Sequence, residues 1–201
     1  MAVVVLASCG GGERAESSSE AASPPEPVLR AASGAAAITE SEIAQIVLAA
    51  NSIDAGFAEL ARSRSEQPEI VRFANTLLAD HNALSAELRR VASQMGLEAP
   101  QHALIAQLQE EAAAARPLLD SLTGPAFDAA YLRREAEFHE VVLAALDETL
   151  IRAARSAQLR TFLENMRPAI EAHYHRARQL IAAPPARRVV EPAGLPVGSE
   201  P

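Results

Sequence analysis

The chain has 201 residues, of which 22% are charged and 3% are aromatic, and its formal net charge is −8. Ala, Leu, Glu and Arg dominate, which favours helices and leaves few of the residues that build a β-sandwich. The excess of 26 acidic over 18 basic residues argues against a nucleic-acid partner, because phosphate binding needs a concentrated basic face.

The N-terminal segment Leu6-Ala7-Ser8-Cys9 resembles a bacterial lipobox, in which the cysteine is lipidated and becomes the new N-terminus. It predicts that residues 1–8 are the end of a signal peptide and that Cys9 anchors the protein to a membrane, on the periplasmic side of the bacterial cell envelope. The alternative is an incidental cysteine after a short apolar run. We expect no other segment to be long and apolar enough to span a membrane.

Two segments are predicted to be disordered because their composition cannot bury enough apolar surface to fold. Residues 9–38 are rich in Gly, Ser, Glu and Pro and would form a flexible tether, and residues 183–201 would form a Pro-rich tail. The remaining residues, 39–182, have apolar side chains at helical spacing and are predicted to form one helical bundle.

The first two long helices have clear boundary signals. Thr39 and Glu42 form a predicted capping box, followed by an apolar stripe over residues 43–60 at steps of three and four. The second helix is predicted to start near Pro68, which suits a first turn, and to end at Gly96.

A short helical connector is predicted over residues 101–122, bent or interrupted by Pro117. The third long helix should begin after Thr123-Gly124-Pro125 and reach Leu150, and the fourth should run from Ser156 to about Ala182. Pro168 either bends this last helix or marks the start of a second segment. The pattern predicts an all-α, four-helix bundle with a short extra connector helix.

Three histidines, His81, His139 and His173, lie on the apolar stripes near the middle of three different long helices. If the helices pack side by side, the three imidazoles meet at one level with Asp54 of the first helix and Glu135. A buried imidazole is costly unless its ring nitrogens are satisfied, so this layer is the candidate functional site.

Two interpretations of the layer are open. In the first, the histidines bind zinc, copper or iron as neutral ligands, with Asp54 or Glu135 supplying an anionic oxygen. Glu135 could instead orient the ring of His139. The remaining candidates for polar partners around the ligands are Tyr131, Asp128 and Asp80.

In the second interpretation, the same groups hydrogen-bond one another and fix the packing of a structural or partner-binding bundle that holds no metal. His102, in a loop, and His175, two residues from His173, are expected to face solvent.

No catalytic motif accompanies the histidines. A di-iron carboxylate bundle requires Glu-x-x-His, and no histidine here has a glutamate three residues before it. The zincin motif His-Glu-x-x-His is also missing. We therefore expect a non-catalytic protein.

Several of these residues are shared with a known bacterial family. The chain resembles domain of unknown function 4142, which is regarded as ferritin-like and often labelled as exported or outer-membrane, over most of residues 40–182. The resemblance rests on Asn51-x-x-Asp54, Phe73-Ala74 followed by Asp80-His81, Gly124-x-x-Phe127-Asp128-x-x-Tyr131 with His139 eight residues later, and Pro168 with His173. The resemblance implies an exported ferritin-like bundle and supports the view that the three histidines act together. It implies no established reaction.

Overall fold

A computed structural model describes residues 38–98 and 103–183. Within these ranges the chain is helical and has no strand, which confirms the predicted all-α class; the ferritin-like relation stays a prediction. Cys9, His102 and nearly all of the two predicted tails lie outside the described residues. The elements are α2 (Glu40–Arg64), α3 (Pro68–Gln94), α4 (Ala103–Ser121), α5 (Gly124–Ala145), the π-helix η2 (Leu146–Leu150), α6 (Ile151–Ala153) and α7 (Ala157–Ala182).

The helix boundaries follow local side-chain chemistry. The Thr39 hydroxyl accepts the backbone N–H of Glu42 at 3.3 Å, and the Glu42 carboxylate accepts the backbone N–H of Thr39 at 2.7 Å, which is the predicted capping box. Pro68 lies in the first turn of α3. Gly96 follows the end of α3 with φ +64°, a left-handed conformation that glycine adopts without steric cost.

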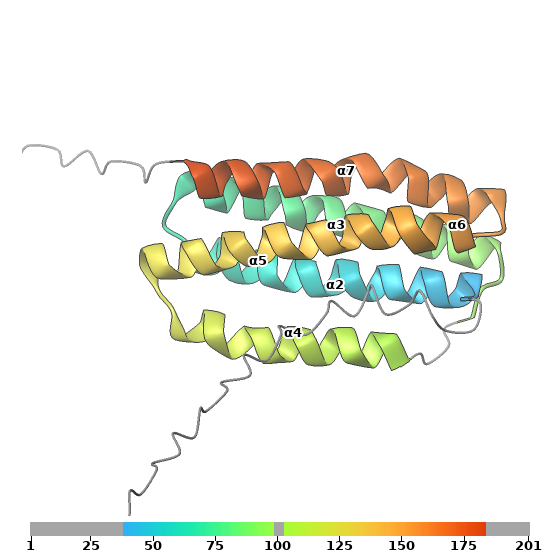
Figure 1. Cartoon of the computed structure of the whole chain (residues 1–201), viewed down its shortest axis with the longest axis horizontal. Helices are drawn as coiled ribbons and strands as arrows, with labels where there is room; N and C mark the ends of the chain where they lie inside the picture. The colour runs from blue at the N-terminus through green and yellow to red at the C-terminus, as the bar shows by residue number, and fades with distance from the viewer. Residues whose placement is uncertain (1–37, 99–102, 184–201) are drawn as a thin grey trace, which may run out of the picture.

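The long helices α2, α3, α5 and α7 lie side by side, with α2 against α3, α5 against α7 and α3 against α7 (Figure 1). The predicted connector is a full helix, α4, which packs on the outside of α2 and also contacts α5. It continues through Pro117, and α7 continues through Pro168. The alternative prediction, that a second helical segment begins at Pro168, is therefore wrong.

The third long helix differs from the prediction near its end. A π-helical turn, η2, inserts between α5 and the short α6, so the helix is wider and locally underwound after Ala145. Around this turn Val142, Ala145, Leu146 and Leu150 are buried, whereas Leu143 is only partly buried.

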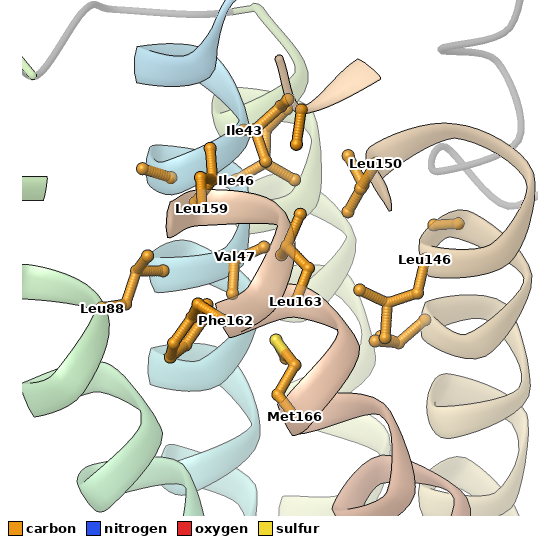
Figure 2. Packing of buried hydrophobic residues seen from close by; sticks show 14 of the residues in the cluster. Ile43, Ile46, Val47, Leu88, Leu146, Leu150, Leu159, Phe162, Leu163 and Met166 are labelled. Atoms are coloured by element: carbon orange, nitrogen blue, oxygen red, sulfur yellow. The ribbon is translucent and has the colours of Figure 1, made fainter. Parts of the chain in front are cut away.

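Two apolar clusters make up the core, one toward each end of the bundle. Figure 2 shows part of the first cluster, in which α2, α3, α5, η2 and α7 contribute residues such as Ile43, Ile46, Leu88, Leu146, Leu163 and Met166. The second cluster contains, among others, Phe57, Phe73, Leu77, Phe127, Tyr131 and Ala177. The buried polar layer lies between the two clusters.

One helix corrects the expectation about membrane spans. By length and composition α2 is apolar enough to cross a membrane, with a mean hydropathy of 1.2 over its most apolar stretch. More than half of that stretch is buried within the bundle. The helix also carries two buried polar residues, Asn51 and Asp54, which belong to the polar layer of the bundle. These are the properties of a core helix.

Candidate metal centre

Each of the four long helices contributes a side chain to the buried polar layer. Asp54 comes from α2, His81 from α3, His139 from α5 and His173 from α7, and none of the four residues is more than 3% exposed. The three ring centroids are 5.2–5.7 Å apart. The structure therefore brings together the three imidazoles and the carboxylate of Asp54.

Two of the rings are held from outside by oxygen atoms that can only accept. The Nδ1–H of His139 donates to the backbone carbonyl of Glu135 at 2.8 Å, and the Nε2–H of His173 donates to the Oδ2 atom of Asp80 at 2.9 Å. Because a carbonyl and a carboxylate require a donor, the opposite nitrogen of each neutral ring carries a lone pair. These lone pairs are on Nε2 of His139 and Nδ1 of His173.

His81 has an oxygen atom on each side. Its Nδ1 lies 3.0 Å from the Oδ1 atom of Asn51, and its Nε2 lies 2.9 Å from the Oδ2 atom of Asp54. The contact with Asn51 has hydrogen-bond geometry. The contact of Nε2 with Asp54 has the distance of an ion pair without the alignment of a hydrogen bond. Because Nδ1 is the nitrogen that is hydrogen-bonded to Asn51, Nε2 is the inward-facing atom of this ring.

The inner atoms of the layer make no hydrogen bond within the described part of the chain. They are Nε2 of His81, Nε2 of His139, Nδ1 of His173 and Oδ2 of Asp54. One ligand atom from each histidine lies within 4.8 Å of the other two. Imidazole nitrogens bound to one tetrahedral zinc ion lie about 3.3 Å apart, so side-chain shifts of about 1 Å would complete such a site.

The carboxylate and the backbone carbonyl of Glu135 contact different partners. Its carboxylate belongs to a second group of possible ligands with Asp54 and His139. However, its Oε1 atom lies 2.6 Å from Nη1 of Arg134, and Oε2 lies 3.8 Å from Nδ1 of His139. It is the backbone carbonyl of Glu135 that orients His139.

Arg134 is the residue that sequence reasoning missed. Its Nη1 atom also donates to Oδ1 of Asp54 at 2.9 Å, and its guanidinium carbon lies 3.6 Å from the ring centroid of Phe57 and 4.7 Å from that of Phe138. Two carboxylates predicted in one buried layer require a cation, and Phe138 lies one turn from Arg134 on α5. Two buried carboxylates together with an aromatic residue one turn from Arg134 were the sequence signal for a buried arginine.

The two buried carboxylates are pushed in opposite directions. Burial opposes ionisation of Asp54, but His139, the His81 contact and Arg134 outweigh it and hold the pKa of Asp54 well below its usual range. Burial and the negative charge of Asp54 raise the pKa of Glu135 well above its usual range, despite Arg134. Asp54 is therefore the ionised carboxylate of the layer.

His139 and His173 are kept neutral by their surroundings. Burial lowers the pKa of His139 to about 4, although Asp54 opposes the shift. Burial also lowers the pKa of His173, partly offset by its hydrogen bond to Asp80. Neutral imidazoles are the form that binds transition metals.

The other predicted site residues lie around the layer. Tyr131 is fully buried and stacked on Phe127, and burial and the carboxylates of Glu135 and Asp54 raise its pKa, but its hydroxyl makes no hydrogen bond to the described residues. Asp128 is buried two turns from Glu135, and no contact in the described part of the chain joins it to the histidines. Asp80 contacts His173, and His175 is exposed.

Comparison with known proteins gives a single assignment. No curated protein and no solved structure matches the chain. A family model described as domain of unknown function (DUF4142) matches residues 26–180, which include α2, α3, α4, α5 and nearly all of α7. The chain therefore belongs to the DUF4142 family.

Proposed function

We propose that this protein is a non-catalytic metal-binding bundle, in which His81, His139 and His173 bind a transition-metal ion with Asp54 as the anionic ligand. The ion would occupy the space between the inner nitrogens, at the junction of the four long helices. Such a site would couple metal binding to the packing of the whole bundle.

One observation carries the proposal. For each ring the outer nitrogen contacts a fixed oxygen acceptor, at 2.8 Å for His139, 2.9 Å for His173 and 3.0 Å for His81, while the inner nitrogens face one another. Histidine ligands in metalloproteins share this arrangement, because the hydrogen bond of the outer nitrogen selects the ring tautomer and orients the lone pair of the inner nitrogen. Leaving a buried polar atom unpaired costs about 1–3 kcal/mol, which a bound cation would offset.

The donor set indicates the class of metal. Three imidazole nitrogens and one carboxylate oxygen suit zinc, copper or iron, whereas magnesium and calcium prefer mostly oxygen ligands. Asp54 is prepared for this role because Arg134 holds its Oδ1 atom while Oδ2 faces His81 and His139 at 2.9 and 3.9 Å.

The metal content of the purified protein tests the proposal. Full-length protein would be stripped of metal with a chelator and loaded separately with zinc, copper and iron. After a desalting column, the bound metal would be measured by inductively coupled plasma mass spectrometry. We expect stoichiometric retention of at least one of these metals, and loss of retention in His139→Ala and His173→Ala.

His175→Ala is a matched control, because His175 is exposed and lies on the same helix as His173. It should retain metal as the wild-type protein does. Folded wild-type protein that retains none of the three metals would contradict the proposal and support the metal-free structural layer. Equal loss in His175→Ala and His173→Ala would also contradict it.

We also propose that Cys9 carries a lipid and holds the bundle at the bacterial envelope. The support is the lipobox-like sequence Leu6-Ala7-Ser8-Cys9 and the long segment rich in Gly, Ser and Glu that follows it. A tether of this composition would let the bundle extend from the membrane surface.

A further inference from the structure

Two overlapping groups of possible ligands share His139. The first contains His81, His139 and His173, and the second contains Asp54, Glu135 and His139. In each group the ligand atoms lie within 4.8 Å of one another, and every residue is buried. Judged by distance alone, the layer could hold two ions side by side.

His139 cannot serve both groups as a neutral ring. Its Nδ1–H donates to the carbonyl of Glu135 at 2.8 Å, which leaves one lone pair, on Nε2. That atom lies 3.9 Å from Oδ2 of Asp54, and its single lone pair can bind one ion, which the proposed function assigns to the group of three histidines. The second group is thereby reduced to the carboxylates of Asp54 and Glu135.

A cation already lies between these two carboxylates. Nη1 of Arg134 is 2.9 Å from Oδ1 of Asp54 and 2.6 Å from Oε1 of Glu135. The guanidinium lies against the rings of Phe57 and Phe138, and the arginine side chain is only 16% exposed. Aromatic faces attract a cation and restrict its movement, so the guanidinium is fixed in this position.

We propose that Arg134 occupies a second cation position and limits the centre to one metal ion. This inference rests on the proposed function, since it concerns the number of ions at the same layer. Removing the guanidinium while keeping both carboxylates would open a position with oxygen ligands. Such a position suits a hard divalent ion such as manganese, next to the nitrogen-rich position of the three histidines.

Metal stoichiometry of wild type, Arg134→Gln and the double variant Arg134→Gln/Glu135→Gln tests the proposal. Each protein would be equilibrated with excess zinc and then with excess manganese, desalted and analysed for both metals. We expect one equivalent in wild type, two in Arg134→Gln and one in the double variant, which loses a carboxylate of the second position.

The outcomes separate this inference from the proposed function. Two equivalents in wild type, or one in a folded Arg134→Gln, overturn the role of Arg134 and leave the histidine site standing. No metal in wild type overturns both. If Arg134→Gln does not fold alone, refolding with excess manganese should recover it, because the second ion replaces the guanidinium charge; failure to recover also overturns the inference.

Discussion

The Nε2–H of His173 on α7 donates to Oδ2 of Asp80 on α3 at 2.9 Å, and this contact joins the buried layer to the surface. The side chain of His173 is 4% exposed, whereas that of Asp80 is 45% exposed. Asp80 thus orients a buried ring from the solvent side, and it can be changed without opening the core.

We predict that Asp80→Ala weakens metal binding by about 10–100-fold, which is typical when a hydrogen-bond partner of a metal ligand is lost. The number of ions bound should not change. Asp80→Asn should have a smaller effect, because the amide oxygen can still accept from His173. Competition with a chelator of known affinity measures the change, and an Asp80→Ala variant that binds as tightly as wild type would contradict this role.

The low pKa of His139 predicts an acid-dependent loss of stability in metal-free protein. Its folded pKa is about 4, below the unfolded value of about 6.5. Between these values the unfolded chain binds the proton and the folded chain does not, so this contribution is complete above pH 6.5 and falls as the pH decreases. For His139 alone it amounts to about 3 kcal/mol.

Glu135 acts in the opposite direction, because its raised pKa favours the folded state as the pH decreases. Comparing wild type with His139→Gln cancels the contribution of Glu135. The difference in unfolding free energy between the two proteins, measured by urea denaturation with chelator present, should shrink as the pH falls from 7 to 4.5. A difference that is the same at both pH values would show that His139 titrates normally.

Metal binding should stabilise the bundle, because the proposed ligands come from four helices. At a free metal concentration of about 100 times Kd, the gain is about 2.7 kcal/mol, which raises Tm by about 5–10 °C for a chain of this size. Thermal unfolding followed by circular dichroism measures the shift. His175→Ala should show the full shift and His173→Ala almost none; equal shifts in the two variants would place the metal elsewhere.

Lipidation at Cys9 predicts that the full chain, expressed in a bacterium with a lipoprotein pathway, fractionates with membranes and has a mature N-terminus at residue 9. Cys9→Ser should move the protein to the soluble fraction. Mass spectrometry of the N-terminal peptide provides the measurement. An unmodified Cys9 in wild-type protein, or membrane association unchanged in the variant, would contradict the prediction.

The elements of the fold that follow local rules could be read from the sequence. The capping box at Thr39, the proline in the first turn at Pro68 and the glycine at Gly96 each act on neighbouring backbone groups, so their effect does not depend on tertiary structure. The alignment of the histidines could also be anticipated, since side chains at steps of three and four share a helix face.

The features that depend on several helices could not be read in this way. In the sequence, Arg134 beside Glu135 looks like any charged pair on a solvated face. Its burial depends on Asp54 and Phe57, which come from another helix. The π-helical turn at residues 146–150 likewise has no sequence marker, because its apolar residues also fit an α-helix.

X-ray absorption spectroscopy of metal-loaded protein tests the central claim most directly, because it reports the atoms bound to the ion. For a zinc-loaded sample we predict three imidazole nitrogens and one carboxylate oxygen at about 2.0–2.2 Å. The outer-shell scattering of one imidazole should disappear in His139→Ala and persist in His175→Ala. A first shell made of oxygen atoms alone, or an imidazole signal unchanged in His139→Ala, would contradict the claim.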